Sequence, residues 1–104
     1  MASVVGAVAF RTKVLTVSSS VVAITDAGWS WTAGDVDAAD SVVIGVHGAG
    51  VTMTWDGTTP TATTGVPLAA GATCVMSGNG NVRNVKLIRS GASDATVSIT
   101  LEKY

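Results

Sequence analysis

His47 is the one histidine of this sequence and the first candidate for acid–base chemistry. A histidine acts as a general base in a hydrolase when it lies beside a nucleophile, here Ser30 or Ser41, and is oriented by an aspartate. The spacing around His47 matches no such arrangement, and the sequence contains no nucleophile-elbow motif. We therefore interpret His47 as a turn residue next to Gly48 and expect a protein that is not an enzyme.

Asp35, Asp37 and Asp40 lie close enough in sequence to suggest a calcium site, because carboxylate oxygens bind Ca²⁺. An EF-hand loop would also need further oxygen ligands, a glycine and a distal glutamate. The single glutamate of the chain, Glu102, lies far from this segment. Aspartates also begin helical turns and form Asx turns, so we interpret residues 33–40 as a loop with room for one helical turn. We expect no bound metal.

Cys74 and the segment Gly78-Asn79-Gly80 are the remaining candidates for chemistry. A reactive thiol needs partial exposure and a nearby positive charge, and Cys74 has no cationic neighbour in sequence. We expect a small buried strand residue without a disulfide inside the chain, while an intermolecular disulfide stays open. The glycine segment lacks the lysine and the following helix of a phosphate loop, so it predicts a hairpin turn and no cofactor.

The tryptophans are candidates for binding rather than for catalysis. Trp29 and Trp31 alternate with polar residues in a predicted strand over residues 29–32, so both would point to one face. Aromatic faces bind sugar rings and anchor protein interfaces, so this pair is either a contact surface or part of the core. Trp55 alternates with Val51 and Met53, and we interpret it as a core residue.

Charged side chains are scarce in this chain. Six Lys or Arg and seven Asp or Glu make up 12% of the 104 residues, against about 25% in a typical soluble domain. Six cations are too few for a basic nucleic-acid-binding surface. Hydrophobic residues make up 47% of the chain, but no apolar run reaches the roughly 18 residues of a membrane span. Neither nucleic acid nor a membrane is therefore an expected partner.

The few charges are unevenly distributed along the chain. No Lys or Arg occurs between Lys13 and Arg83, and five of the seven acids lie in that gap. Arg83, Lys86 and Arg89 fall within residues 82–89, which we predict to form one strand. The fold would then have an acidic end and a basic strip, through which two copies could meet head to tail. The alternative is a scatter of surface charges without such a role.

Valine, threonine and glycine dominate the composition, whereas the helix-forming residues glutamate, glutamine and leucine are rare. β-branched side chains favour strands. Apolar and polar residues alternate most clearly in residues 41–46 and 94–101, and turn signals such as Asp56-Gly57 separate the apolar segments. The sequence predicts an all-β fold: an antiparallel, jelly-roll-like β-sandwich of about eight short strands.

The N-terminal segment is apolar. We predict that residues 1–12 form an arm or an edge strand and that residues 13–104 form a single sandwich domain. An unpaired chain end can add to a partner as a strand, so Val4, Val5 and Phe10 are candidate contact residues. The segment lacks the positive region that precedes the apolar run of a signal peptide, so we expect synthesis in a cytoplasm without export.

Residues 54–65, with the sequence TWDGTTPTATTG, resemble a segment common in small proteins of tailed bacteriophages and prophages. The resemblance extends in order over most of the chain, through stretches like residues 13–25, 67–71 and 95–100. Val66 stands where a histidine is usual in those proteins, and the Trp-Ser-Trp segment is not characteristic of them. The central turn is the specific part of the match.

This resemblance implies a non-enzymatic structural protein of the virion, made in the host cytoplasm. The leading hypothesis is a capsid decoration or cement protein that bridges and stabilises capsid subunits. Its partners would be copies of itself, as a trimer for example, and the major capsid protein or other virion proteins. A neck, tail or fibre-associated module is the alternative, and a carbohydrate-binding module using the first two tryptophans is a third.

In the leading hypothesis, uncharged Val, Ala and Thr surface makes the contacts, and the scarce charges mark the rim or set the docking orientation. The candidate contact residues are Val4, Val5, Phe10, Trp29, Trp31, Arg83, Lys86 and Arg89.

Overall fold

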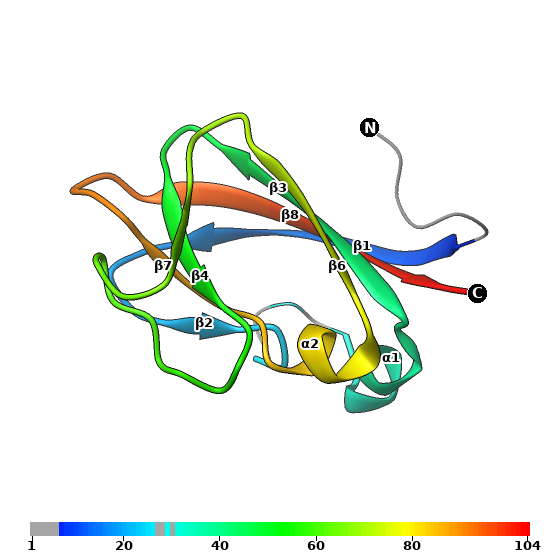
Figure 1. Ribbon diagram of the computed structural model, residues 1–104. Helices are drawn as coiled ribbons and strands as arrows, with labels where there is room; N and C mark the ends of the chain where they lie inside the picture. The colour runs from blue at the N-terminus through cyan, green and yellow to red at the C-terminus, as the bar shows by residue number, and fades with distance from the viewer. Residues whose placement is uncertain (1–6, 27–28, 30) are drawn as a thin grey trace.

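Two antiparallel four-stranded sheets and two short helices make up the computed structural model, which describes residues 7–26, 29 and 31–104 (Figure 1). In chain order the elements are β1 (Val8–Val17), β2 (Val22–Ala23), α1 (Ala33–Ala38), β3 (Ser41–His47), β4 (Val51–Thr54), β5 (Val66–Leu68), β6 (Thr73–Ser77), α2 (Asn79–Arg83), β7 (Lys86–Arg89) and β8 (Ala95–Lys103).

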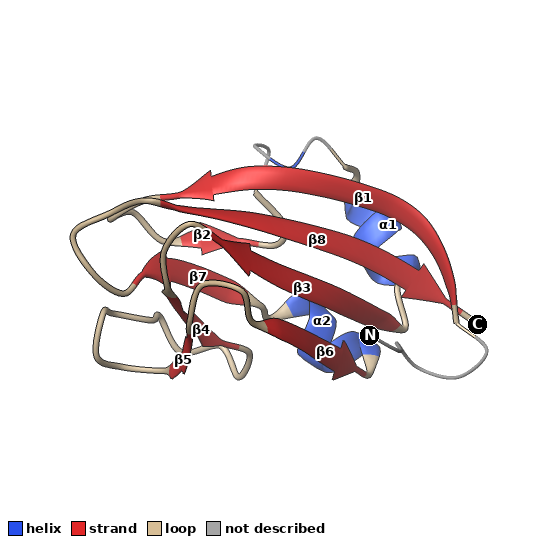
Figure 2. Cartoon of the chain, turned by 90° about the horizontal axis from the view of Figure 1, so that it is seen from above, coloured by secondary structure: helices blue, strands red, loops and turns tan. Residues whose placement is uncertain are grey.

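The strand order defines how the chain connects the two sheets. One sheet has the order β1-β8-β3-β6 and the other has the order β2-β7-β4-β5. Every link between successive strands crosses to the opposite sheet, except the link from β4 to β5. Eight strands connected in this way form a jelly roll, so the predicted all-β, jelly-roll-like sandwich is confirmed. Figure 2 shows β1, β8, β3 and β6 side by side in that order.

The inward side chains of β3 and β8 form the centre of the core. They are at most 1% exposed, and they are Val42, Ile44, Val46, Ala95, Val97, Ile99 and Leu101. Val51, Met53 and Leu87 are buried with them from the opposite sheet. Burying each aliphatic side chain of this size stabilises the fold by about 1.5–3 kcal/mol. The alternation predicted for these two strands is confirmed.

Residues 29, 31 and 32 do not form the predicted strand, and residue 30 lies outside the described residues. Trp29 and Trp31 lie in the connection between β2 and α1. Thr32 and Asp35 start α1 immediately afterwards with a capping box: Thr32 Oγ1 accepts the Asp35 N–H and Asp35 Oδ2 accepts the Thr32 N–H, each at 3.1 Å. Val36 anchors this helical turn in the core. The helix allowed for within residues 33–40 is therefore present.

Residues 77–89 differ from the prediction of a hairpin turn followed by one long strand. Residues 79–83 form α2, and only the last four residues of the segment form β7. The side-chain amide of Asn79 donates to three carbonyl oxygens at 2.8–3.1 Å, those of Val36, Asp37 and Ala39. These bonds fasten α2 to the end of α1, where carbonyl groups lack partners inside the helix. The helix thus depends on a partner segment about 40 residues away.

β1 runs across the point where we predicted an arm to meet the domain. It covers Val8–Val17 without a break at residues 12 and 13 and pairs with β8 over nearly its whole length. Because β8 is its one neighbour in the sheet order, β1 is an edge strand. The candidate contact residues Val4 and Val5 lie outside the described residues.

Candidate interaction surfaces

The first candidate surface, the tryptophan pair, is mostly internal. The rings of Trp29 and Trp31 stack with centroids 5.2 Å apart and an interplanar angle of 6°. Trp29 Nε1 donates to the carbonyl oxygen of Ala23 at 3.1 Å, and Trp31 Nε1 donates to that of Ile24 at 2.7 Å. Trp29 is 0% exposed, whereas Trp31 is half-buried. Trp29 therefore has no ring face open to a sugar or a partner, and the pair ties the connection to β2.

The basic strip expected on one strand does not exist. Arg83 ends α2, whereas Lys86 and Arg89 belong to β7. Two of these cations are paired with acids of the same chain: Arg83 Nε lies 3.4 Å from Asp37 Oδ1, and Arg89 Nη1 lies 2.7 Å from Asp94 Oδ1.

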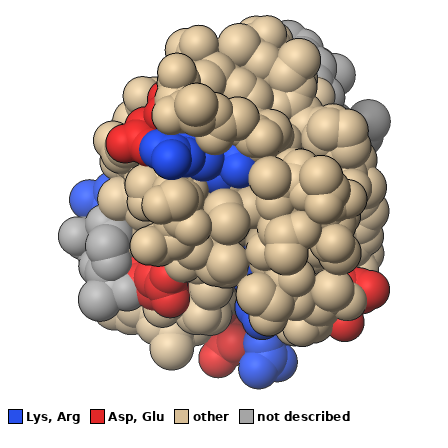
Figure 3. Space-filling model, turned by 90° about the vertical axis from the view of Figure 1, so that its left-hand side faces the viewer, with Lys and Arg blue, Asp and Glu red and all other residues tan. Residues whose placement is uncertain are grey.

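A third ion pair joins Arg11 Nε to Asp35 Oδ2 at 3.4 Å. On the face in Figure 3, basic side chains near the top and at the bottom lie beside acidic ones, other acidic side chains stand apart, and most of the surface is uncharged. Folding therefore brings acids and cations that lie apart in the sequence into contact.

Phe10 lies where β1 bulges, at the register shift between Ala9 and Arg11. Its ring is half-buried, with Lys103 Nζ 5.0 Å and Arg11 Cζ 5.9 Å from the ring centroid. Elsewhere on the strand, Val8 and Val14 are each 62% exposed. A ten-residue edge strand presents backbone N–H and C=O groups that another strand can pair with. The β1 edge is therefore a candidate contact surface.

The outer side of the β1-β8-β3-β6 sheet is uncharged in its central rows. Cross-strand pairing places Thr12, Thr100, Val43 and Val75 in one row and Val14, Ser98, Gly45 and Thr73 in the next. Thr16 and Thr96 continue this surface along β1 and β8. We name this set the Thr/Val face: Thr12, Val14, Thr16, Val43, Gly45, Thr73, Val75, Thr96, Ser98 and Thr100. All ten residues are exposed or half-buried. The sequence predicted uncharged contact surface, but only the strand pairing shows which residues form it.

The segment TWDGTTPTATTG, residues 54–65, leaves β4 and folds back over it as a loop. The hydroxyl groups of Thr52 and Thr54 donate to the loop carbonyls of Ala62 and Thr58, at 3.2 and 2.6 Å. The loop is itself ordered by side-chain acceptors. Asp56 Oδ1 accepts the Thr58 N–H at 2.9 Å, Thr61 Oγ1 accepts the Thr64 N–H at 2.9 Å, and Pro60 is buried. The turn predicted at Asp56-Gly57 is confirmed, with Gly57 at φ +91°.

Gly65 is required where this loop returns to β5. Its φ is +132°, a conformation that residues with a side chain rarely adopt. A Cβ at this position would lie 2.8 Å from Thr52 Cγ2 and 2.9 Å from the Met53 carbonyl oxygen. The residues of the motif therefore specify a loop conformation, and their chemistry is explained by that structural role.

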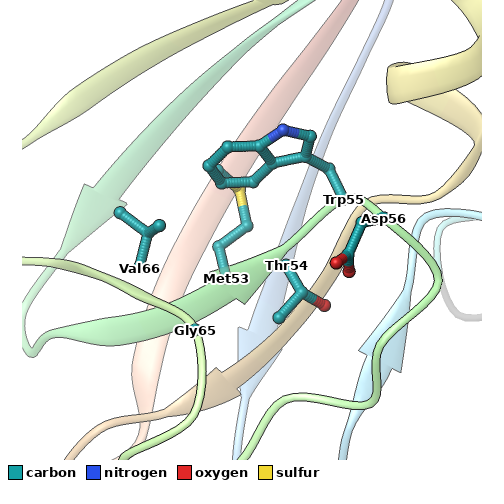
Figure 4. A pocket seen from close by; sticks show the side chains of 6 residues that line it. All are labelled: Met53, Thr54, Trp55, Asp56, Gly65 and Val66. Atoms are coloured by element: carbon teal, nitrogen blue, oxygen red, sulfur yellow. The ribbon is translucent and has the colours of Figure 1, made fainter.

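A hollow of about 260 Å³ lies beside this loop. Figure 4 shows the residues that line it, which are Met53, Thr54, Trp55, Asp56, Gly65 and Val66. Trp55, which we expected in the core, packs against the core but is only half-buried. Hydrogen bonding from the Thr58 N–H holds the pKa of Asp56 below its ordinary value of 3.8, so this exposed carboxyl is charged at neutral pH. The hollow was not predicted from the sequence, because residues from β4, the loop and β5 line it together.

His47, Ser41 and the three candidate calcium ligands do not form a catalytic or metal-binding cluster, and Ser30 lies outside the described residues. His47 is exposed at the end of β3. Asp40 Oδ2 accepts the backbone N–H of Tyr104 at 3.0 Å, and the other two candidate calcium ligands form the ion pairs described above. Across residues 7–26, 29 and 31–104, no three His, Cys, Asp or Glu side chains are grouped to hold a metal ion.

Cys74 is a half-buried residue of β6, so the prediction of a strand position is confirmed. Its Sγ lies 3.9 Å from the sulfur of Met76. Burial raises the pKa of the Cys74 thiol above its ordinary value of 9.0. The side chain is therefore protonated at neutral pH, which is the unreactive form.

Comparisons with known proteins identify no relative: no family model, no curated protein and no solved structure matches this chain. None of the helices in the described part of the chain is long and apolar enough to cross a membrane.

Proposed function

We propose that this protein is a non-enzymatic structural subunit of a virion, specifically a capsid decoration protein that bridges neighbouring capsid subunits. The observation that carries the proposal is the Thr/Val face together with the adjoining β1 edge. Val14 belongs to both surfaces and is 62% exposed. A partner that covers the Thr/Val face removes no Lys, Arg, Asp or Glu side chain of that face from water, so docking there avoids the main cost of burying polar surface. The β1 edge beside it carries the exposed cations Arg11 and Lys13.

The size of the Thr/Val face indicates how such docking would work. Four strands about 4.8 Å apart and about five residues of 3.3 Å each give a face on the order of 300 Å². A standard interface buries roughly 800 Å² on each partner. The face alone is therefore too small for a tight contact, and the β1 edge must contribute. Repetition of a weak contact over a symmetric shell then supplies stability through avidity.

The fold is compatible with a capsid decoration protein, and the sequence likeness favours that role. Jelly rolls are frequent among viral capsid domains and also among lectins. Because one fold serves many functions, the fold does not choose between these classes. The likeness of residues 54–65 to small phage proteins favours the viral role. The full burial of Trp29 counts against a sugar-binding platform built from Trp29 and Trp31.

A pair of lysine substitutions tests the docking surface. Val14 and Ser98 are neighbours across β1 and β8, so Val14→Lys with Ser98→Lys places two charges in the centre of the Thr/Val face. Ser93→Lys, in the exposed link between β7 and β8, is the matched control. We expect all variants to fold, and only the double variant to lose co-sedimentation with particles that lack the native protein, by about tenfold or more. Undiminished binding of the double variant would overturn the proposal.

Copy number in purified particles separates a shell position from a tail position. Hundreds of copies per particle support decoration of the capsid, because a shell repeats its subunit contacts many times. A count of about six to a few dozen overturns it in favour of the neck, tail or fibre-associated alternative.

A further inference from the structure

The β1-β8-β3-β6 sheet ends on one side at β6, a five-residue strand that contains no charged residue. Figure 2 shows β6 at the margin of this sheet, and among the described residues β3 is its one strand neighbour. Thr73 and Ser77 are exposed, and Val75 between them is half-buried. The free side of β6 is therefore accessible to a further strand.

The hydrogen bonds to β3 show which backbone groups of β6 lack a partner. The Gly78 N–H donates to the Asp40 carbonyl at 2.8 Å, in the register that pairs β3 with β6. Bonded residues alternate along an antiparallel strand, so the even-numbered residues of β6 bond to β3 and the odd-numbered ones point away. The carbonyl of the last odd-numbered residue accepts the side-chain amide of Asn81 at 2.9 Å, as this direction requires. The backbone groups that point away from β3 are those of Thr73, Val75 and Ser77.

The other three edges of the sandwich carry features that hinder strand addition. β2 has two residues, and β5 has three, including Pro67, which lacks a backbone donor. β1 bulges at Phe10, and its cations Arg11 and Lys13 lie on the side that faces the core. The two registers that pair most of β1 with a copy of itself set Arg11 opposite Lys13, or Lys13 opposite Lys13. Like charges directly opposite each other are destabilising, so β6 is the edge suited to self-pairing.

We propose that β6 pairs with β6 of a second copy of this chain, antiparallel and about a twofold axis at Val75. In this register Val75 lies opposite Val75, Thr73 opposite Ser77, and Cys74 opposite Met76. The residues whose backbone groups point away from β3 then face one another, which is the arrangement of hydrogen-bonded pairs in an antiparallel ladder. No charged side chain of β6 is brought opposite another, because the strand has none. A twofold contact of this kind closes on itself, so it gives a dimer rather than a fibre.

This dimer would join the Thr/Val faces of the two copies, because Thr73 and Val75 belong to that face. The combined face is on the order of 600 Å², nearer to the roughly 800 Å² that a standard interface buries on each partner. The inference does not depend on the proposed function, because dimerisation is measured without particles. A dimer that fails to bind particles would contradict the proposed function alone.

Analytical ultracentrifugation of the full chain measures the association. Because a five-residue strand makes a small contact, we expect a monomer–dimer equilibrium that shifts with concentration. Val75→Lys sets two lysines opposite each other at the axis and should weaken the dimer by about three- to tenfold. Thr12→Lys is the matched control and should leave the association unchanged, since Thr12 lies in the same row of the Thr/Val face but on β1, at the far side of the sheet.

Cysteine cross-linking tests the register of the pairing. In a Cys74→Ser background, Val75→Cys places two thiols on opposite residues with Cα atoms about 5.5 Å apart, within the range of a disulfide. Val43→Cys is the matched control, because Val43 lies beside Val75 in the same row on β3. Its counterpart in the copy would lie three strand spacings away, about 14 Å, which is too far for a disulfide. We expect oxidation to give a covalent dimer of the Val75→Cys variant only.

Each of four results would overturn the inference. A chain that stays monomeric up to its highest soluble concentration would exclude the β6 dimer. Equal cross-linking of the two cysteine variants would indicate random collision instead of strand pairing. An association that Thr12→Lys weakens and Val75→Lys does not would place the contact at the β1 edge. Open chains instead of dimers would indicate pairing of β1 with β6 between successive copies.

Discussion

Replacing Gly65 with alanine tests whether the loop over β4 is held in place by close packing. Gly65 has φ +132°, and an added Cβ would lie 2.9 Å from the Met53 carbonyl oxygen and 2.8 Å from Thr52 Cγ2. Gly57 provides the matched control in the same loop, since its φ is +91° but a Cβ there would meet nothing within 4 Å. Both substitutions place a side chain at positive φ, and only Gly65→Ala adds the overlap.

The expected magnitudes follow from these two contributions. A residue with a side chain at positive φ costs roughly 1–2 kcal/mol, which is the expected destabilisation for Gly57→Ala. Overlap with a backbone atom and a buried methyl group adds about 1–3 kcal/mol for Gly65→Ala. We therefore expect Gly65→Ala to lower the free energy of unfolding by about 3–4 kcal/mol, some 2 kcal/mol more than Gly57→Ala.

Urea denaturation followed by far-ultraviolet circular dichroism measures both free energies. In a thermal melt, 2 kcal/mol corresponds to a difference in Tm of about 10 °C for a domain of this size. Equal destabilisation by the two substitutions would refute the packing argument, because it would mean that the loop moves away from β4 without cost.

Three further predictions concern the helices and the cysteine. Asn79→Ala should lower the free energy of unfolding by about 1–2 kcal/mol, and Asn79→Asp should lower it further, because a carboxylate would face the three carbonyl oxygens to which Asn79 now donates. Urea denaturation measures both free energies. A smaller loss for Asn79→Asp than for Asn79→Ala would contradict this contact. The Thr32 backbone N–H, aided by Arg11, holds the pKa of Asp35 below 3.8, so its stabilisation is complete above that pH and is lost as the pH falls through the lower folded-state value. Asp35→Asn should therefore reduce the loss of stability in acid melts, and an unchanged acid dependence would argue against the bond. Because burial raises the pKa of Cys74 above 9.0, its reaction with a disulfide reagent should be slow at neutral pH and should still be accelerating with pH at pH 9.0. A rate that levels off below pH 9.0 would show an activated thiol instead.

The local pattern of apolar and polar residues was sufficient to predict most of the strands. Alternation of apolar and polar residues predicted which side chains of β3 and β8 enter the core, because successive residues of a strand point to opposite faces. The Asp56-Gly57 turn was equally visible, since Gly57 adopts a positive φ and Asp56 accepts a nearby backbone N–H. These features depend only on neighbours within a few residues.

The same local reading was wrong where distant partners decide the structure. Asn79 looked like part of a turn, but its amide binds carbonyl groups about 40 residues earlier and begins a helix. Trp29 and Trp31 looked like strand residues, but the capping box at Thr32 and the carbonyls of Ala23 and Ile24 place them in a connection. Short alternating segments of this kind fit several structures, and tertiary contacts select one.

By itself, then, the sequence determined the fold class, the inward faces of the longer strands and the scarcity of charge. Only the tertiary structure decided where the uncharged surface lies, because Thr12 and Thr100 are 88 residues apart in sequence and their hydroxyl oxygens are 3.0 Å apart in the sheet. Folding also pairs Arg83 with Asp37 and leaves Asp56 without a cation among the described residues. Composition fixes how many charges exist, whereas strand pairing and helix packing bring particular side chains together, and binding surfaces are made by that proximity.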